Sequence, residues 1–233
     1  MGFIDDFKVD QELQIKTLCV AFFLIIFPLY FFSVAAGTDS PTGMGGVGKY
    51  SVSGDMTYID FESGEETIAD GSPLLLDLNT DALDDIADKN IVGVLVSMSY
   101  GEDETEDGIG VLPCATGSLS ADTITGTASH LNFSSSADGQ NDGGSGAHDV
   151  ITEWYNSSMI GQDIEGLSEL EIAEQLDSNG AGLGDYTIEI SVTANSQNSP
   201  GCTRTDTGET VSYTIQLIVL DYSIVPFVEI ENI

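Results

Sequence analysis

Oxygen-bearing side chains recur along one short stretch near the middle of the chain. Asp138, Asn141 and Asp142 follow one another closely, and Asp149 falls at the twelfth position counted from Asp138. Calcium prefers oxygen ligands, which a twelve-residue loop supplies at alternating positions around a sharp glycine turn. The stretch is therefore a candidate calcium site at these four residues, and otherwise no cofactor is expected. A second acidic run, at residues 102–108, is the other candidate, although such runs are usually solvated loops. Two features depart from the usual loop: Gln140 replaces an Asp or Asn, and the closing residue is Asp rather than Glu.

Ser145, His148 and Asp149 carry the side-chain types of a second chemistry, the hydrolysis of an ester or amide. Residues 143–147 come within one position of the Gly-x-Ser-x-Gly turn that exposes a nucleophilic serine. However, Ala147 occupies the final glycine position, and no apolar strand leads into the turn. We therefore expect no catalytic residue and no enzymatic activity, and an envelope hydrolase is the least favoured alternative.

A glycine-rich string at residues 43–50, GMGGVGKY, matches the spacing of a phosphate-binding loop. Such a loop needs a buried strand before it and a helix after it, so that backbone N–H groups and the helix terminus hold the phosphate. Here an apolar run and a glycine-rich spacer precede the string, and an alternating strand pattern follows it. We interpret residues 37–49 as a flexible linker and expect no nucleotide.

Cys114 and Cys202 lie in two stretches rich in Gly, Ser and Thr, and Cys19 lies in the apolar run near the N-terminus. Outside the cytoplasm disulfides persist, so a Cys114–Cys202 bridge is expected. It would close a loop of about 89 residues, for which the chain-entropy model gives roughly 4–5 kcal/mol. Two free thiols are the alternative.

Two Asn-x-Ser/Thr tripeptides begin at Asn132 and Asn156. Such tripeptides are acceptors for N-glycosylation outside the cytoplasm, although they also occur by chance. They predict that both asparagines lie on the surface of an extracytoplasmic domain.

Residues 18–36 form a run of nineteen residues without a charge. As a helix they would span about 28 Å, close to the hydrocarbon thickness of a bilayer. The run predicts one transmembrane helix behind a short cytoplasmic tail, residues 1–17. A cleaved signal peptide, with Ser33–Ala35 as its cleavage site, is the alternative. The run is longer than a signal-peptide core, and the tail before it lacks the usual basic character.

The basic residues next to the apolar run predict its orientation. Lys8 and Lys16 precede it, whereas the first basic residue after it is Lys49. Because basic residues are retained on the cytoplasmic side, the N-terminus is expected in the cytoplasm and residues 50–233 outside.

The composition is strongly acidic. The 233 residues include 39 acidic and 5 basic ones, for a net charge of −34. This excess argues against nucleic-acid binding, which depends on Lys and Arg at the phosphates. Acidic residues run along the whole chain, which favours a halophilic protein kept soluble in concentrated salt over a set of cation sites. The two interpretations are compatible.

Alternating apolar residues predict β-strands throughout residues 50–233, most clearly at 91–100, 186–194 and 211–220. Seven or eight such strands, separated by Gly/Ser/Asp loops, predict a mainly β fold, an antiparallel β-sandwich. A short helix is expected from Ser168, with Glu171 as its capping-box partner, and another turn or two at Thr80–Lys89.

The stretch GDYTIEISVTA at 184–194, followed by VSYTIQLIVL at 211–220, resembles the closing hairpin of immunoglobulin-like or fibronectin-like ectodomains. The resemblance implies an immunoglobulin-like sandwich. The acidity and the single anchor resemble envelope proteins of archaea. Cys114 and Cys202 are expected in loops and not in opposed core strands, unlike the cysteines of true immunoglobulin domains.

These features predict a non-catalytic structural or interaction module of the cell envelope. It would contact the lipid bilayer through residues 18–36, and other envelope proteins or a surface polymer through strand edges or loops. The alternative is a ligand- or calcium-sensing ectodomain, or an accessory subunit of a membrane machine such as the stator of a filament motor.

The acidity generates a prediction about salt. The Debye length falls from about 30 Å at 10 mM monovalent salt to about 3 Å at 1 M. Repulsion among the carboxylates favours the unfolded chain, so the melting temperature should rise across this range. A thermal melt series in NaCl measures it, and a melting temperature independent of salt would contradict the halophilic interpretation.

Overall fold

The structure is a computed structural model that describes residues 48–101, 105–108, 120–141, 144–196 and 202–227, together with Phe22, Phe23 and Phe27. The chain divides into two compact units, Met1–Gly46 and Val47–Ile233. Most of the predicted membrane run therefore lies outside the described residues. Among the residues that are described, no helix is long and apolar enough to cross a membrane.

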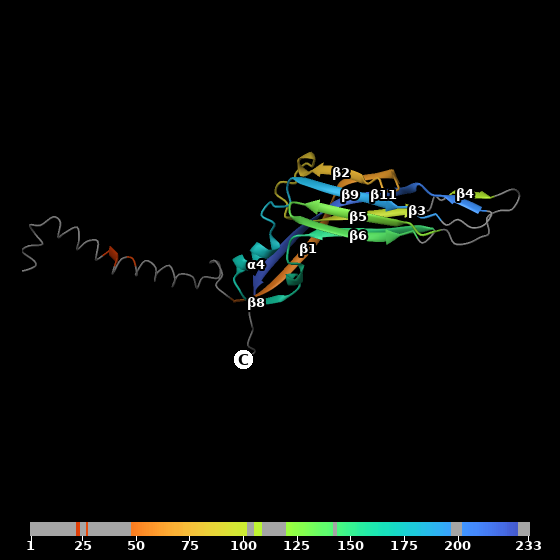
Figure 1. Cartoon of the computed structure of the whole chain (residues 1–233). Coiled ribbons are helices and arrows are strands. Elements are labelled where there is room, and N and C mark those ends of the chain that lie inside the picture. Colours follow the sequence, from red (N-terminus) through yellow and green to blue (C-terminus); the bar gives the residue numbers. More distant parts are fainter. Residues whose placement is uncertain are drawn as a thin grey trace, which may run out of the picture. The chain divides into compact units, whose positions relative to one another are not determined.

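The second unit, which we call the two-sheet domain, contains a five-stranded and a four-stranded antiparallel sheet (Figure 1). The larger sheet has the strand order β7-β3-β11-β1-β8 and the smaller one β2-β9-β5-β6. A short pair, β4 (Thr105–Gly108) and β10 (Cys202–Thr205), forms a third ladder. The strands of the larger sheet are β1 (Gly48–Ala69), β3 (Ile91–Gly101), β7 (Ser145–Glu153), β8 (Asp163–Leu167) and β11 (Gly208–Pro226). Those of the smaller sheet are β2 (Leu74–Asn79), β5 (Thr123–His130), β6 (Phe133–Gln140) and β9 (Asp185–Thr193).

Alternation of apolar and polar residues gives each central strand one buried face. In β3, Val94, Val96 and Met98 are buried, whereas the intervening Ser97 is half-buried and Ser99 exposed. This is the pleat expected of a strand with one face in the core. The predictions of a mainly β fold and of antiparallel sheets are confirmed.

The main core lies where the inner faces of the two sheets meet. Side chains of β3 and β11 from the larger sheet join side chains of β5 and β9 from the smaller one in a single cluster. Its fully buried members include Val96, Ile124, Ile188, Ile215 and Leu217. Burial of each such side chain contributes roughly 1.5–3 kcal/mol, so this cluster holds the two sheets together.

A second cluster lies on the opposite face of the larger sheet, at the end where β8 and α4 (Glu169–Leu176) are seen in Figure 1. Ile172 and Leu176 of the helix pack with Ile218 and Leu220 of β11. The predicted capping box is confirmed, because Ser168 caps the helix and Glu171 bonds back to it. These hydrogen bonds from Ser168 lower the pKa of the Glu171 carboxyl.

Several elements differ from the prediction. Residues 80–89 contain only the 3-10 turn η3 (Thr80–Ala82); a second such turn, η4 (Ser157–Met159), was not expected. Cys202 begins a short strand instead of lying in a loop. Strand β1 starts within the predicted linker and continues to Ala69, well past the end of its apolar alternation at Tyr58. Pairing with β11 maintains it there, across a bulge between Asp60 and Glu62.

Tyr186 generates a prediction about alkaline pH. Its side chain is fully buried, its hydroxyl donates to the Gly182 carbonyl oxygen at 2.6 Å, and burial raises its pKa well above the usual value. A raised pKa means that the folded state favours the neutral phenol. The contribution of this group to the free energy of unfolding is therefore fully present below the unfolded-state pKa of about 10. It is lost progressively as pH rises above that pKa.

Tyr186→Phe should lower the free energy of unfolding by about 1–2 kcal/mol at pH 8, because the buried hydrogen bond is lost. Between pH 8 and 11, the free energy of unfolding of this variant should fall by at least about 1 kcal/mol less than that of the unaltered protein. Urea unfolding at both pH values measures this. Tyr58→Phe, at an exposed tyrosine, is the control, and an unchanged alkaline loss in Tyr186→Phe would contradict the assignment.

Candidate functional site

Three carboxylates that are far apart in the sequence meet beside the ends of β5, β6 and β11. Asp122 precedes β5, Asp206 lies between β10 and β11, and Glu209 is the second residue of β11. One oxygen from each lies within 4.8 Å of the others. Asp122 and Glu209 are completely buried. We call these three residues the carboxylate cluster.

Asn141, which follows β6, connects Asp122 and Glu209 of the carboxylate cluster. Its Nδ2 donates to Asp122 Oδ2 at 2.9 Å and to Glu209 Oε1 at 3.1 Å, and its Oδ1 accepts from the Asp122 N–H at 2.9 Å. The Asn195 N–H donates to the second oxygen of Asp122 at 2.6 Å. Hydrogen bonds from Asn141 and Asn195 therefore join two further segments of the chain to the cluster.

The electrostatics of the carboxylate cluster limit what it can do. Removing ionised carboxylates from water is costly, and like charges at this spacing repel one another strongly in a low-dielectric interior. A cation of the class that prefers oxygen ligands would relieve this repulsion. The arrangement can thus hold such a cation, and no histidine is among its three residues.

The described residues do not bring the predicted calcium ligands Asp138, Asn141 and Asp149 together. Asp138 is exposed on β6, where its carboxylate accepts from Thr125 Oγ1 at 2.6 Å. Asp149 is exposed on β7, on the outer face of the other sheet. Asn141 belongs to the carboxylate cluster, and Asp142 lies outside the described residues. The calcium loop stays a prediction that the described residues do not assemble.

The predicted disulfide and sequons have different placements. Cys114 and the side chain of Cys202 lie outside the described residues, so the bridge stays a prediction. Asn132 is exposed in the two-residue turn that joins β5 to β6. Asn156 is half-buried, and its Nδ2, the atom that would carry a glycan, donates to Gln175 Oε1 at 2.8 Å. Asn132 is thus the more accessible acceptor.

Of the residues considered for ester or amide hydrolysis, Asp149 and His148 point in different directions. Asp149 faces outward from β7, whereas the neighbouring His148 faces Tyr100, whose hydroxyl lies 3.1 Å from His148 Nδ1. The other histidine, His130, is buried against Tyr186 with ring centroids 4.0 Å apart. Both histidines therefore pack within the domain instead of facing an exposed serine.

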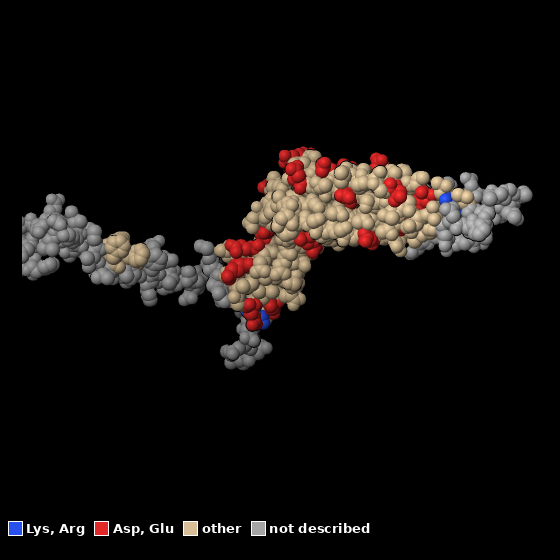
Figure 2. Space-filling model, viewed as in Figure 1, with Lys and Arg blue, Asp and Glu red and all other residues tan. Residues whose placement is uncertain are grey.

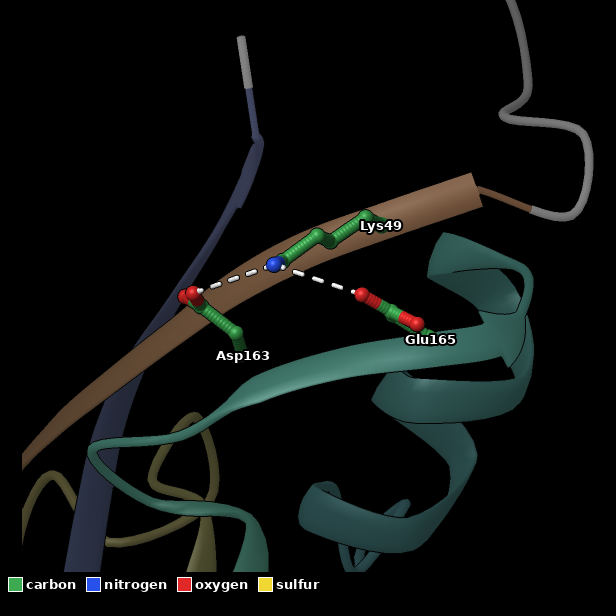
Figure 3. A network of polar contacts seen from close by, with 3 residues as sticks. All are labelled: Lys49, Asp163 and Glu165. Carbon is green, nitrogen blue, oxygen red and sulfur yellow. Dashed lines mark ion pairs between the residues drawn. The ribbon is translucent and has the colours of Figure 1, made fainter. Parts of the chain in front are cut away.

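Lys49, from the glycine-rich string, lies in a strand and not at the start of a helix. Figure 3 shows its ammonium group between Glu165 Oε1, at 3.3 Å, and Asp163 Oδ2, at 3.7 Å, both on β8. The same group lies 4.2 Å from the centre of the Phe227 ring. These surface contacts, worth at most about 1 kcal/mol each, tie β1 to β8 and to the end of β11.

An exposed apolar patch on the outer face of the larger sheet was missed by sequence reasoning. Met56 and Tyr58 continue the same face of β1 as the buried Val52, but they lie beyond the cover of α4 and β8 and are 39% and 51% exposed. Tyr155 donates from its hydroxyl to Met56 Sδ at 3.7 Å. Burial, and then the nearby Glu153 carboxylate, raise the pKa of Tyr155. We call Met56, Tyr58 and Tyr155 the tyrosine patch.

No protein-family model matches the chain, and no curated protein matches it significantly. The sequence contains no local signal for the carboxylate cluster, because its members are spread from residue 122 to residue 209. The acidic residue Glu209, placed directly before the alternating run of β11, is the one sequence feature that could have indicated the cluster.

Asn141 supplies a prediction. Asn141→Ala removes the donor to two buried carboxylates, so the free energy of unfolding should fall by about 2–4 kcal/mol. Gln140→Ala, at the exposed neighbouring position, is the matched control and should change it by less than about 0.5 kcal/mol. Urea unfolding of both variants measures the difference, and equal effects would show that the cluster contributes nothing specific to stability.

Proposed function

We propose that the protein is a non-catalytic, membrane-anchored interaction module of the cell envelope, with its two-sheet domain outside the cytoplasm. The observation that carries this proposal is the succession of a nineteen-residue charge-free run and an acidic β domain in one chain. A run of this length suits a bilayer span, and the basic residues around it favour an outward-facing domain.

The surface of the domain supports an extracytoplasmic, solvated setting. Figure 2 shows acidic side chains scattered over the visible face instead of gathered into one patch. Only Lys49, Lys89 and Arg204 are basic among the residues after the anchor run. Such a surface suits a salt-rich medium and repels nucleic acid and anionic lipid headgroups.

The two facing sheets also support the finer proposal of an immunoglobulin-like sandwich, a class used widely for recognition. Its members present loops and strand edges to partners, and functions differ between members of one fold. In this protein the tyrosine patch offers apolar and aromatic side chains at the surface, which is typical of contacts with other proteins.

Membrane topology supplies the test. Protease added to intact cells should degrade the region after Gly48 and spare an epitope placed before residue 17, since only the two-sheet domain faces outward under this proposal. Detergent-permeabilised cells are the control, in which both parts should be degraded. A two-sheet domain that resists protease in intact cells but not in permeabilised ones would overturn the orientation.

A further inference from the structure

One side of the larger sheet ends in a strand edge that the described residues leave uncovered. Strand β1 pairs with β8 only over Gly48–Ser51, and Val52 then bonds through its N–H and C=O to the loop before β8. From Ser53 onward, β11 is the one strand that the described residues pair with β1. Between Val52 and Ile68 no residue of β1 is buried.

The direction of the backbone groups follows from Val52. Because both of its groups point away from β11, the alternation of a strand directs those of Gly54, Met56 and Tyr58 to the same side. A bulge between Asp60 and Glu62 ends this regular stretch, and the Ser63 N–H beyond it is taken up by Glu62 Oε1 at 3.0 Å. The open edge is therefore Ser53–Asp60, about 27 Å of strand.

Both apolar and acidic side chains are exposed along the open edge. Met56 and Tyr58 of the tyrosine patch project from it on the outer face of the sheet, where a neighbouring strand would place its own alternate side chains. Asp55, Asp60 and the adjacent Glu62 are exposed along the same segment. The nearest cation in the strand, Lys49, lies against Asp163 and Glu165 of β8.

We propose that the Ser53–Asp60 edge binds an extended segment of another protein by strand addition, and that this segment places apolar residues beside Met56 and Tyr58 and Lys or Arg beside the exposed carboxylates. The main chain would supply the ladder, the tyrosine patch the apolar contacts, and the carboxylates the charge complementarity. A second copy of this chain fits poorly, because pairing two such edges sets carboxylates against carboxylates, and the chain has only 5 basic residues. The inference rests on the proposed interaction function and names the class of partner.

The test uses the full-length chain in nanodiscs of neutral phosphatidylcholine and a twelve-residue peptide that alternates lysine and valine. A second peptide, with two central valines replaced by proline, has the same charge but cannot form the ladder. At about 0.15 M NaCl the proline peptide should bind at least about tenfold more weakly. Hydrogen exchange at Gly54, Met56 and Tyr58 should slow at least about tenfold on addition of the first peptide.

Variants of the edge provide the second readout. Met56→Pro removes an outward N–H without touching the β11 ladder and should weaken peptide binding at least about tenfold, whereas Met56→Thr keeps the N–H and is its control. The double change Asp55→Asn and Asp60→Asn should weaken binding and flatten its salt dependence. A thermal melt checks that each variant folds, and the exchange experiment on the unaltered chain is independent of them.

Four outcomes would overturn the proposal: no binding of the alternating peptide, equal binding of the proline peptide, protection confined to other strands, or self-association of the chain through this edge. The last outcome, detected by sedimentation, would make a second copy the occupant. None of these measurements depends on cellular orientation, so their failure leaves the topology result unaffected, and failure of the topology test leaves the edge result standing.

Discussion

The long antiparallel pairing of β1 with β11 is the constraint on which the rest of the structure depends. It runs from Tyr50 opposite Pro226 to Ala69 opposite Gly208, with one bulge. Because side chains alternate along a strand, β11 contributes Leu217 to the core between the sheets and Ile218 to the cluster under α4. One strand pair thereby joins two separate hydrophobic clusters, and a slip of one residue would exchange their members.

The same pairing places the polar features. At one end of it, Glu209 turns inward beside Asp122, where Asn141 donates one hydrogen bond to each of the two carboxylates. Buried polar groups that are hydrogen-bonded across several segments constrain how those segments pack. At the other end, Lys49 joins β1 to β8 through contacts on the surface. The acidic composition is thus tolerated by spreading most carboxylates over the solvated exterior (Figure 2).

Other elements cover only part of the outer face of the larger sheet, which leaves apolar side chains exposed on the rest. Helix α4 and strand β8 bury Tyr50 and Val52, but Met56 and Tyr58, farther along the same strand, stay exposed. The neighbouring edge carries exposed acidic residues and a bulge, two features by which natural sheets keep exposed edges from pairing with one another. An acidic edge beside aromatic side chains excludes like-charged partners and remains open to oppositely charged ones.

The sequence by itself determined the strands β3, β9 and β11, because their apolar alternation reflects the local pleat. It also determined the helix cap at Ser168, because a capping box is a contact between near neighbours. It also set the charge of the surface. Only the tertiary structure decided that Asp122, Asp206 and Glu209 meet, since strand register brings together residues that no local pattern relates. The exposure of Tyr58 was decided in the same way: alternation predicts which face of a strand a side chain takes, but the reach of α4 and β8 decides whether that face is covered.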